Sequence, residues 1–191
     1  MKKRVLVIVA HPDDETIWMG GTLLDNKDKW ETTLISLCRK DDADRAPKFK
    51  KVCKHFNTEC HISDLDDEKM NNIDSTEVIS RVKKFIQNKE FDYIFTHGEN
   101  GEYGHKRHVD VHKAVIKMVN KEELKAKKAF FFSYASRGEF AYPKKGSDKL
   151  IYLNDVTLKE KKQLIQYFYG YPKGGFEEVC CRNIEAFNIK K

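Results

Sequence analysis

Two short segments of the chain combine histidine with carboxylate side chains, the residue types that bind metal ions and transfer protons. Residues 10–15 read Ala-His-Pro-Asp-Asp-Glu, and residues 101–108 read Gly-Glu-Tyr-Gly-His-Lys-Arg-His. Together they supply His11, Asp14 and His108, which is a set of two imidazoles and one carboxylate. Such a set leaves a coordination position open for water, as in catalytic zinc sites, and non-haem iron accepts the same donors.

The neighbouring side chains in both segments are suited to acid–base work. Asp13 directly precedes Asp14, so one carboxylate of the pair can bind a cation while the other accepts a proton. His105 and His108 are three residues apart and would share one helix face, which His112 continues. Each segment also has a non-functional explanation. Asp and Glu are favoured at any helix N-terminus, and two histidines spaced three apart often lie on a helix surface by chance. Two such segments, each following a predicted strand, favour a functional site.

Apolar runs of strand length alternate with patterns of helical period. Strands are predicted at residues 5–10, 32–38, 91–96 and 129–134, with a weaker candidate at 60–62. Helices are predicted from the apolar stripes Val78-Val82-Phe85-Ile86, Val111-Val115-Met118-Val119 and Leu164-Ile165-Phe168, the first capped by Asp74 or Ser75 and the last ended by Gly170 and Pro172. This alternation predicts an α/β fold, with a mostly parallel sheet and helices on both faces. Ligands bind such sheets at the carboxyl ends of the strands, where both histidine-bearing segments lie.

The chain has the length of one ordinary domain. Its 191 residues contain no internal repeat and no long linker, so we predict a single domain over residues 1–191. Residues 137–149, rich in glycine, lysine and aromatic side chains, are expected to form a surface loop.

Composition narrows the classes of protein. The longest apolar run, residues 5–10, is far shorter than the ~20 residues that span a bilayer, and it leads into residues 11–15 without a cleavage site. The five cysteines include no Cys-x-x-Cys pair, which argues against a disulfide framework. We therefore expect a soluble, cytoplasmic protein without a membrane partner. A rival metal cluster of Cys53, His55, Cys60 and His61 matches no common zinc pattern.

The positive charge is dispersed. Lys and Arg number 36 against 30 Asp and Glu, which gives a net charge of +6, but the basic residues fall in short clusters diluted by acids. A solvated lysine-rich surface explains this distribution better than a nucleic-acid partner does.

The two histidine-bearing segments, in this order and separation, resemble those of the PIG-L/LmbE-like zinc-dependent N-deacetylase family. The resemblance implies a Rossmann-like three-layer sandwich and hydrolysis of an N-acetyl group, typically on a glucosamine-containing substrate. By position it implies that zinc is bound by His11, Asp14 and His108. It also implies that Asp13 is the general base. The remaining implied roles are a charge-stabilising or proton-donating His105 and a Tyr103 that assists the oxyanion.

The chain departs from the family pattern at one place. Many members have Pro-Asp between the two histidines, where this sequence has Lys106-Arg107. An acidic partner for His105 is then missing, and Asp110 is a candidate replacement. Members also carry a substrate-contacting arginine, for which Arg45 or Arg39 is the candidate.

The sequence thus predicts a zinc-dependent hydrolase that removes the acetyl group from N-acetylglucosamine, its oligomers or its conjugates. The partner expected is a small amino sugar, on which Trp18, Tyr103, Tyr142 or Tyr169 could stack, and an oligomeric state is left open. One alternative is a zinc amidase acting on a non-sugar amide, such as a thiol conjugate or an antibiotic. A further alternative is a non-catalytic module that binds glycans or nucleic acid.

Overall fold

Seven strands form one sheet with the order β3-β2-β1-β4-β5-β9-β8 in the computed structural model, which describes residues 1–190. The strands are β1 (Lys3–Val9), β2 (Trp30–Cys38), β3 (Glu59–Leu65), β4 (Glu90–Thr96), β5 (Lys125–Phe132), β8 (Lys149–Tyr152) and β9 (Ile184–Lys190). The first five are parallel to one another, whereas β9 runs antiparallel to β5 and β8 antiparallel to β9. The predicted mostly parallel sheet is confirmed.

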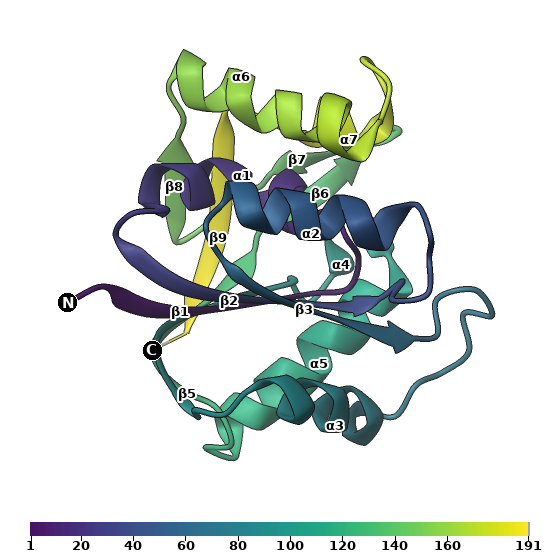
Figure 1. Cartoon of the computed structure of the whole chain (residues 1–191), viewed down its shortest axis with the longest axis vertical. Coiled ribbons are helices and arrows are strands. Elements are labelled where there is room, and N and C mark those ends of the chain that lie inside the picture. Colours follow the sequence, from purple (N-terminus) through teal and green to yellow (C-terminus); the bar gives the residue numbers. More distant parts are fainter. Residues whose placement is uncertain (191) are drawn as a thin grey trace.

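Helices cover both faces of this sheet (Figure 1). They are α1 (Asp14–Asn26), α2 (Arg45–His55), α3 (Ser75–Phe85), α4 (Gly101–Gly104), α5 (Lys106–Asn120), α6 (Asp155–Gln163), its π-helical continuation η1 (Leu164–Tyr169) and α7 (Phe176–Cys180). Alternate residues of β1 divide between two apolar cores: Val7 packs with α1 and α2, and Leu6 packs with α3 and α5. The three-layer arrangement follows from this alternation of a strand buried on both sides.

Several predicted elements are confirmed with longer bounds than the sequence indicated. The weak candidate at 60–62 is the full strand β3, and the helix after Asp74 begins at Ser75 with the Asp74 carboxylate accepting from Thr76 N. Gly170, at φ 83°, ends η1 as expected. Residues 45–55, which carry no clear apolar stripe, form the helix α2 that the sequence did not predict.

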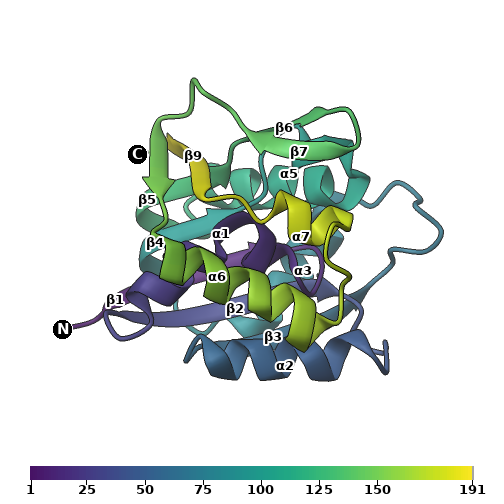
Figure 2. The same cartoon turned by 90° about the horizontal axis from the view of Figure 1, so that it is seen from above.

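The expected loop at residues 137–149 is wrong in part. Residues 134–143 form a hairpin of β6 (Tyr134–Arg137) and β7 (Phe140–Pro143), and Lys149 already begins β8. Figure 2 shows this hairpin beside α7. The alternation of Ala141, which is buried, with the partly exposed Phe140 and Tyr142 is a strand pattern of period two.

The topology creates one crevice at the carboxyl ends of the strands. The central strand β1 has β2 on one side and β4 on the other, so the connections leave it in opposite directions. Ile8 of β1 pairs with Thr96 of β4, which brings the segments that follow these strands together. The chemistry-bearing residues therefore meet at the point where the strand order reverses.

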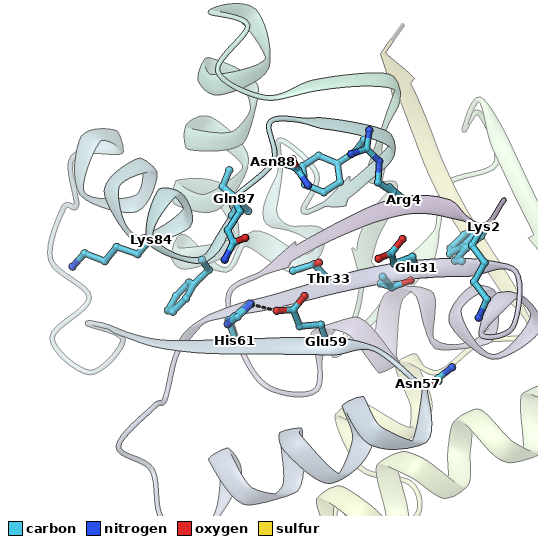
Figure 3. A pocket seen from close by; sticks show the side chains of 15 residues that line it. Lys2, Arg4, Glu31, Thr33, Asn57, Glu59, His61, Lys84, Gln87 and Asn88 are labelled. Carbon is cyan, nitrogen blue, oxygen red and sulfur yellow. Dashed lines mark ion pairs between the residues drawn. The ribbon is translucent and has the colours of Figure 1, made fainter.

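A second, larger cavity of about 710 Å³ lies at the opposite, amino ends of the strands. Figure 3 shows its side chains, which come from the beginnings of β1, β2 and β3 and from the end of α3. Its single histidine, His61, lies 3.2 Å from Glu59 and stacks on Phe85. Because the paired histidines and carboxylates are all at the other end, the smaller cavity there is the candidate site. Among the residues that the structure describes, no helix is both long and apolar enough to cross a membrane.

Candidate metal and catalytic site

The backbone turns sharply where β1 passes into α1. Asp13, the N-cap residue of α1, has a φ of 113°, and its carbonyl accepts from the amides of Thr16 and Ile17 at 2.9 Å. Arg39 (φ 72°) and Met70 (φ 51°), which line the cavity, also have positive φ, as does Glu102 (φ 58°), which accepts from His108. Such conformations cost about 1–3 kcal/mol each for a side chain other than glycine, and they persist where the surrounding structure holds them. The strain is therefore concentrated at the candidate site.

The expected metal ligands converge on one point. His11 Nδ1 lies 3.2 Å from Asp14 Oδ2 and 3.2 Å from His108 Nε2, while His108 Nε2 lies 3.3 Å from Asp14 Oδ1. Zinc with ligands at about 2.0–2.1 Å in a tetrahedron needs ligand atoms roughly 3.3 Å apart. These spacings, taken to the two oxygens of Asp14, match that separation, so the three side chains fit a zinc-sized ion.

Each of these imidazoles presents its other nitrogen to a buried carboxylate. His108 Nδ1 donates to Glu102 Oε2 at 2.6 Å, and His11 Nε2 lies 3.0 Å from Asp67 Oδ1. Carboxylates in this position fix the ring orientation and tautomer of metal-binding histidines. Asp67 is itself held by Arg39, whose Nη2 donates to it at 2.7 Å.

His97, at the end of β4, stacks on His108 with 3.9 Å between the ring centroids. Its Nε2 accepts from Ala10 N at 2.9 Å, and its Nδ1 donates to Glu102 Oε2 at 2.8 Å. The Ala10 amide proton occupies the Nε2 lone pair, so His97 holds β1 and Glu102 in place and is not free to bind a metal.

The adjacent carboxylates have opposite protonation behaviour. Burial, reinforced by the charge of Asp14, raises the pKa of Asp13 well above its ordinary value, although Tyr171 and Arg45 oppose this. Burial would also raise the pKa of Asp14, but His108 and the other imidazoles around it hold that pKa well below its ordinary value. Neighbouring acids separated in this way are typical of a site with one permanent anion and one proton acceptor.

The site attracts positive charge. Burial lowers the pKa of His11, but Asp14 and Asp67 outweigh it and raise that pKa to about 9. Without a metal, a proton therefore compensates the buried carboxylates. The donor set and this negative surrounding together fit a divalent cation.

His105 and Tyr103 line the same cavity. The His105 ring lies 4.7 Å from that of His11 and 4.6 Å from that of His108, between centroids. Burial, followed by the charges of His108 and His11, lowers the pKa of His105 to about 4, so this imidazole is neutral at pH 7. Its Nδ1 has no hydrogen-bond partner among residues 1–190.

Asp110 does not serve as the partner of His105. Asp110 Oδ2 instead accepts from Arg107 Nη1 at 2.8 Å and lies 3.7 Å from Lys106 Nζ. The expected replacement was wrong because the two basic residues that depart from the family pattern take up this carboxylate themselves.

The cavity holds about 220 Å³ and is lined by both candidate arginines. Arg45 Nη1 lies 4.0 Å from Asp13 Oδ2, whereas Arg39 is committed to Asp67. Arg45 is therefore the better placed of the two to meet a substrate. The lining is completed by residues of α1, of the loop after β3 and of α7: Ile17, Trp18, Met70, Phe176 and Glu177.

Two of the four aromatic candidates are excluded from the site. The Tyr169 hydroxyl is buried and donates to Glu15 at 2.7 Å. The Tyr142 ring packs against Arg182, whose Cζ lies 4.0 Å from the ring centroid. Trp18 and Tyr103 do line the cavity, and Trp18 Nε1 donates to Asp14 Oδ1 at 3.0 Å.

The rival cluster of cysteines and histidines does not assemble in the described part of the chain. His55 Nε2 lies 2.7 Å from Glu160, and His61 stacks on Phe85, so neither imidazole turns towards Cys53 or Cys60. All five cysteines are free thiols.

Sequence reasoning assigned no role to several residues of the site. Glu102 and His97 lie inside the glycine-containing segment that was singled out, where a carboxylate close to two histidines was a usable signal. Asp67 and Tyr171 carried no such signal, because each comes from a loop distant in sequence from both histidine-bearing segments. His112 leaves the cavity altogether and has its Nδ1 2.9 Å from His97 O.

A profile of the PIG-L family, described as GlcNAc-PI de-N-acetylase, matches residues 6–119 and so contains both histidine-bearing segments. The chain belongs to the PIG-L family. Among individual sequences, the PIG-L chain is 26% identical over 122 residues to the uncharacterized protein L374 of Acanthamoeba polyphaga mimivirus. That match covers 56% of this chain and 54% of L374, so it spans about half the length of this relative.

Solved structures share the fold of this PIG-L protein. The conserved protein TT1542 of Thermus thermophilus has a TM-score of 0.72 at 15% identity, covering 97% of this chain and 94% of its own. The A40926 pseudoaglycone deacetylase Dbv21 has a TM-score of 0.62 at 11% identity, covering 89% and 83%. GalB of Pseudomonas putida KT2440, a 4-carboxy-2-hydroxymuconate hydratase, has a TM-score of 0.66 at 13% identity, covering 100% and 95%. The Rossmann-like three-layer fold is thus shown, and the family supports a deacetylase among the hydrolases.

Proposed function

We propose that this protein is a zinc-dependent N-deacetylase that hydrolyses the acetamido group of a glucosamine-containing substrate. The observation that carries the proposal is the convergence of His11, Asp14 and His108, at 3.2–3.3 Å from one another, beside the proton acceptor Asp13. Membership of a family described by de-N-acetylation of a glucosamine lipid supports the reaction class.

His11, Asp14 and His108 would hold the metal. A bound zinc supplies Lewis-acid chemistry, since it polarises a carbonyl and lowers the pKa of water to about 7. Burial, followed by the charge of Asp14, raises the pKa of Asp13, so its carboxylate would be a stronger base than an exposed one. Tyr171 and Arg45 contact the Asp13 carboxylate and keep it directed into the cavity.

The groups opposite Asp13 are placed to meet the substrate. Burial, followed by the charges of His108 and His11, lowers the pKa of His105 to about 4, so at pH 7 the neutral ring would donate its one N–H to the developing oxyanion. The Tyr103 hydroxyl stays protonated because burial raises its pKa, so it donates to the same oxygen. The leaving amine needs one proton as the C–N bond breaks, and Asp13, which has taken one from the attacking water, would return it to that nitrogen.

The cavity size favours a small substrate. Its volume of about 220 Å³ is below the roughly 300–1,000 Å³ of typical ligand pockets, and it suits one sugar ring with its acetamido group. Trp18 and Tyr103 supply aromatic walls, and Arg45 supplies a cation for an anionic substituent. We expect the protein to act on such a small amino sugar in the cytoplasm.

A non-sugar amide is the second candidate substrate. The fold shared with Dbv21, described as a deacetylase of an antibiotic pseudoaglycone, supports an antibiotic as a substrate and does not specify which amide is cleaved. The catalytic residues would be the same, and only the cavity wall formed by Met70 and Phe176 would select the substrate.

The test is acetate release from a panel that contains N-acetylglucosamine, its oligomers, a glycosidic conjugate and N-acetylated non-sugar amines. We expect release from an amino sugar, loss of activity with EDTA and recovery with Zn²⁺. Asp13→Ala should lower turnover by roughly 100-fold or more while zinc is still bound. Asp28→Ala, which removes an exposed carboxylate, is the matched control. Turnover that persists in Asp13→Ala would remove this residue from the reaction, and release only from non-sugar amides would select the second candidate.

A further inference from the structure

Arg107 is a fully buried cation in the first turn of α5, directly before His108. Its guanidinium reaches across to the loop between β3 and α3, where Nε donates to Asp66 O and Nη1 donates to Asn71 O at 2.8 Å. A further contact of 3.1 Å joins Nη2 to Asp66 Oδ2. One side chain therefore holds both ends of residues 66–71.

The neighbouring basic residue reinforces this attachment. Lys106 Nζ also donates to Asn71 O, at 3.0 Å. Asp110, one turn along α5, accepts from Arg107 Nη1 at 2.8 Å and balances the buried charge. Lys106 and Arg107, consecutive at the start of α5, thus provide the anchors of the loop.

The other contacts of the loop are few: Arg39 donates to Asp67 and lies 3.9 Å from Glu68, and Lys69 N donates to Asp66 Oδ1 at 3.4 Å. Residues 68–72 are exposed and contain no helix or strand, and the segment projects at the edge of the sheet towards which the strands point (Figure 1). Two of its side chains nevertheless belong to the site. Asp67 is buried with Oδ1 3.0 Å from His11 Nε2, and Met70 lines the cavity.

We propose that Arg107 is a positioning residue that fastens residues 66–71 to α5, and thereby holds Asp67 against His11 and Met70 over the cavity. The guanidinium is suited to this because its planar fork satisfies two carbonyls and two carboxylates at once, which a lysine cannot do. The helix that carries His108 and the loop that backs His11 are thus joined by one residue. The effect on zinc rests on the proposed metal centre, whereas the effect on the loop does not.

The first experiment is limited trypsin digestion of the metal-free protein, followed by mass spectrometry of cleavage after Lys69, which is exposed in the loop. Arg107→Met should accelerate this cleavage by about tenfold, because protection by a held segment falls as its local opening becomes easier. Arg81→Met is the matched control: Arg81 bonds Ser63 and Glu77 beside the loop, and its loss should leave the rate unchanged.

The second experiment is a double-mutant cycle on zinc affinity, measured by competition with a chromophoric chelator. Arg107→Met should weaken zinc binding by about tenfold, the lower end of the range for outer partners of a metal site. In an Asp67→Asn background it should add less than about twofold, because Arg107 acts through Asp67. A purely structural role would give the same loss in both backgrounds.

The outcomes separate this inference from the proposed function. Unchanged cleavage at Lys69, or equal zinc losses in the two backgrounds, would overturn the role of Arg107. A protein that binds zinc but releases no acetate would contradict only the proposed function, since neither experiment needs turnover. Should Arg107→Met not fold, Lys106→Ala removes one anchor from a partly exposed position and must still accelerate cleavage by a few-fold.

Discussion

Replacing Glu102 by glutamine removes one charge from the site and changes almost no volume. In the native protein the Glu102 carboxylate accepts three hydrogen bonds: from His97 Nδ1 at 2.8 Å, from His108 Nδ1 at 2.6 Å and from Gly98 N at 2.7 Å. The two imidazoles share Oε2, and the Gly98 amide uses Oε1. A glutamine has one carbonyl oxygen and one NH2 group, so it places a donor against a donor in either orientation.

The magnitude follows from these contacts. If the amide oxygen faces the imidazoles, the Gly98 N–H loses a charged acceptor and stays buried, which costs about 2–3 kcal/mol, and two charge-assisted bonds weaken by about 1 kcal/mol each. Glu102→Gln should therefore lower the free energy of unfolding by about 4–5 kcal/mol. Zinc affinity should fall by about 10–100-fold, because His108 is no longer held in its binding tautomer.

The assay is urea denaturation of the metal-free protein at pH 7, with zinc affinity measured separately. Glu99→Gln is the matched control, since Glu99 is an exposed carboxylate in the same loop. Burial opposes ionisation of Glu102, but His97 and His108 outweigh it and lower its pKa from 4.5 to about 2. The carboxylate's contribution is thus complete above the unfolded value of 4.5 and lost as pH falls towards 2, so the difference between the two proteins should shrink over that interval. A Glu102→Gln protein with native stability and zinc affinity at pH 7 would refute the reasoning.

Three further outcomes are expected. Tyr171→Phe removes the hydrogen bond that stabilises the Asp13 carboxylate, so the pKa of Asp13 rises. The acid limb of the kcat/KM profile should then move to higher pH. We expect roughly tenfold lower activity on the acid side of the profile and little change on its plateau. In the native protein Lys161 Nζ lies 2.7 Å from Oε1 of the fully buried Glu185. Lys161→Met leaves this carboxylate without its cation and should lower the free energy of unfolding by about 3–5 kcal/mol, measured by urea titration. Lys162→Met, beside it in sequence and partly exposed, should cost less than about 1 kcal/mol. Removal of metal with EDTA should preserve the circular dichroism spectrum. Free zinc at about 1,000 times its Kd should raise the free energy of unfolding by about 4 kcal/mol. Unfolding on chelation would show that the two apolar cores do not keep the chain folded without the ion.

The order of the elements and the place of the site were readable from local patterns. The run at residues 5–10 is apolar on both faces, as a central parallel strand must be, and the histidine-bearing segments follow strands that pair through Ile8 and Thr96. Glu102 was within reach of the same reasoning, because it lies six residues from its partner His108. Local spacing therefore predicts contacts made within one turn or one strand end.

Contacts that depend on sheet order were not readable. Asp67 meets His11 because β3 lies two strands from β1, and nothing in the acidic stretch at residues 64–68 distinguishes this carboxylate from its solvated neighbours. Tyr171 reaches Asp13 only after the chain has left η1 at Gly170. The hairpin of β6 and β7 was missed for a related reason, since its short strands pair with each other and carry only a weak alternation.

The carboxylates would make the proposed site bind a cation better than the histidines alone. Asp14, Asp67 and Glu102 have pKa values held low by the imidazoles or by Arg39 even though burial opposes it, so all three are anions at pH 7. In the metal-free protein the excess negative charge is met by a proton on His11, whose pKa is raised to about 9. In the proposed centre, a metal bound through His11 Nδ1 would replace that proton, because one lone pair cannot serve both. Proton and metal would therefore compete for the same nitrogen, and the carboxylates that raise the pKa of His11 are the ones that would favour the metal.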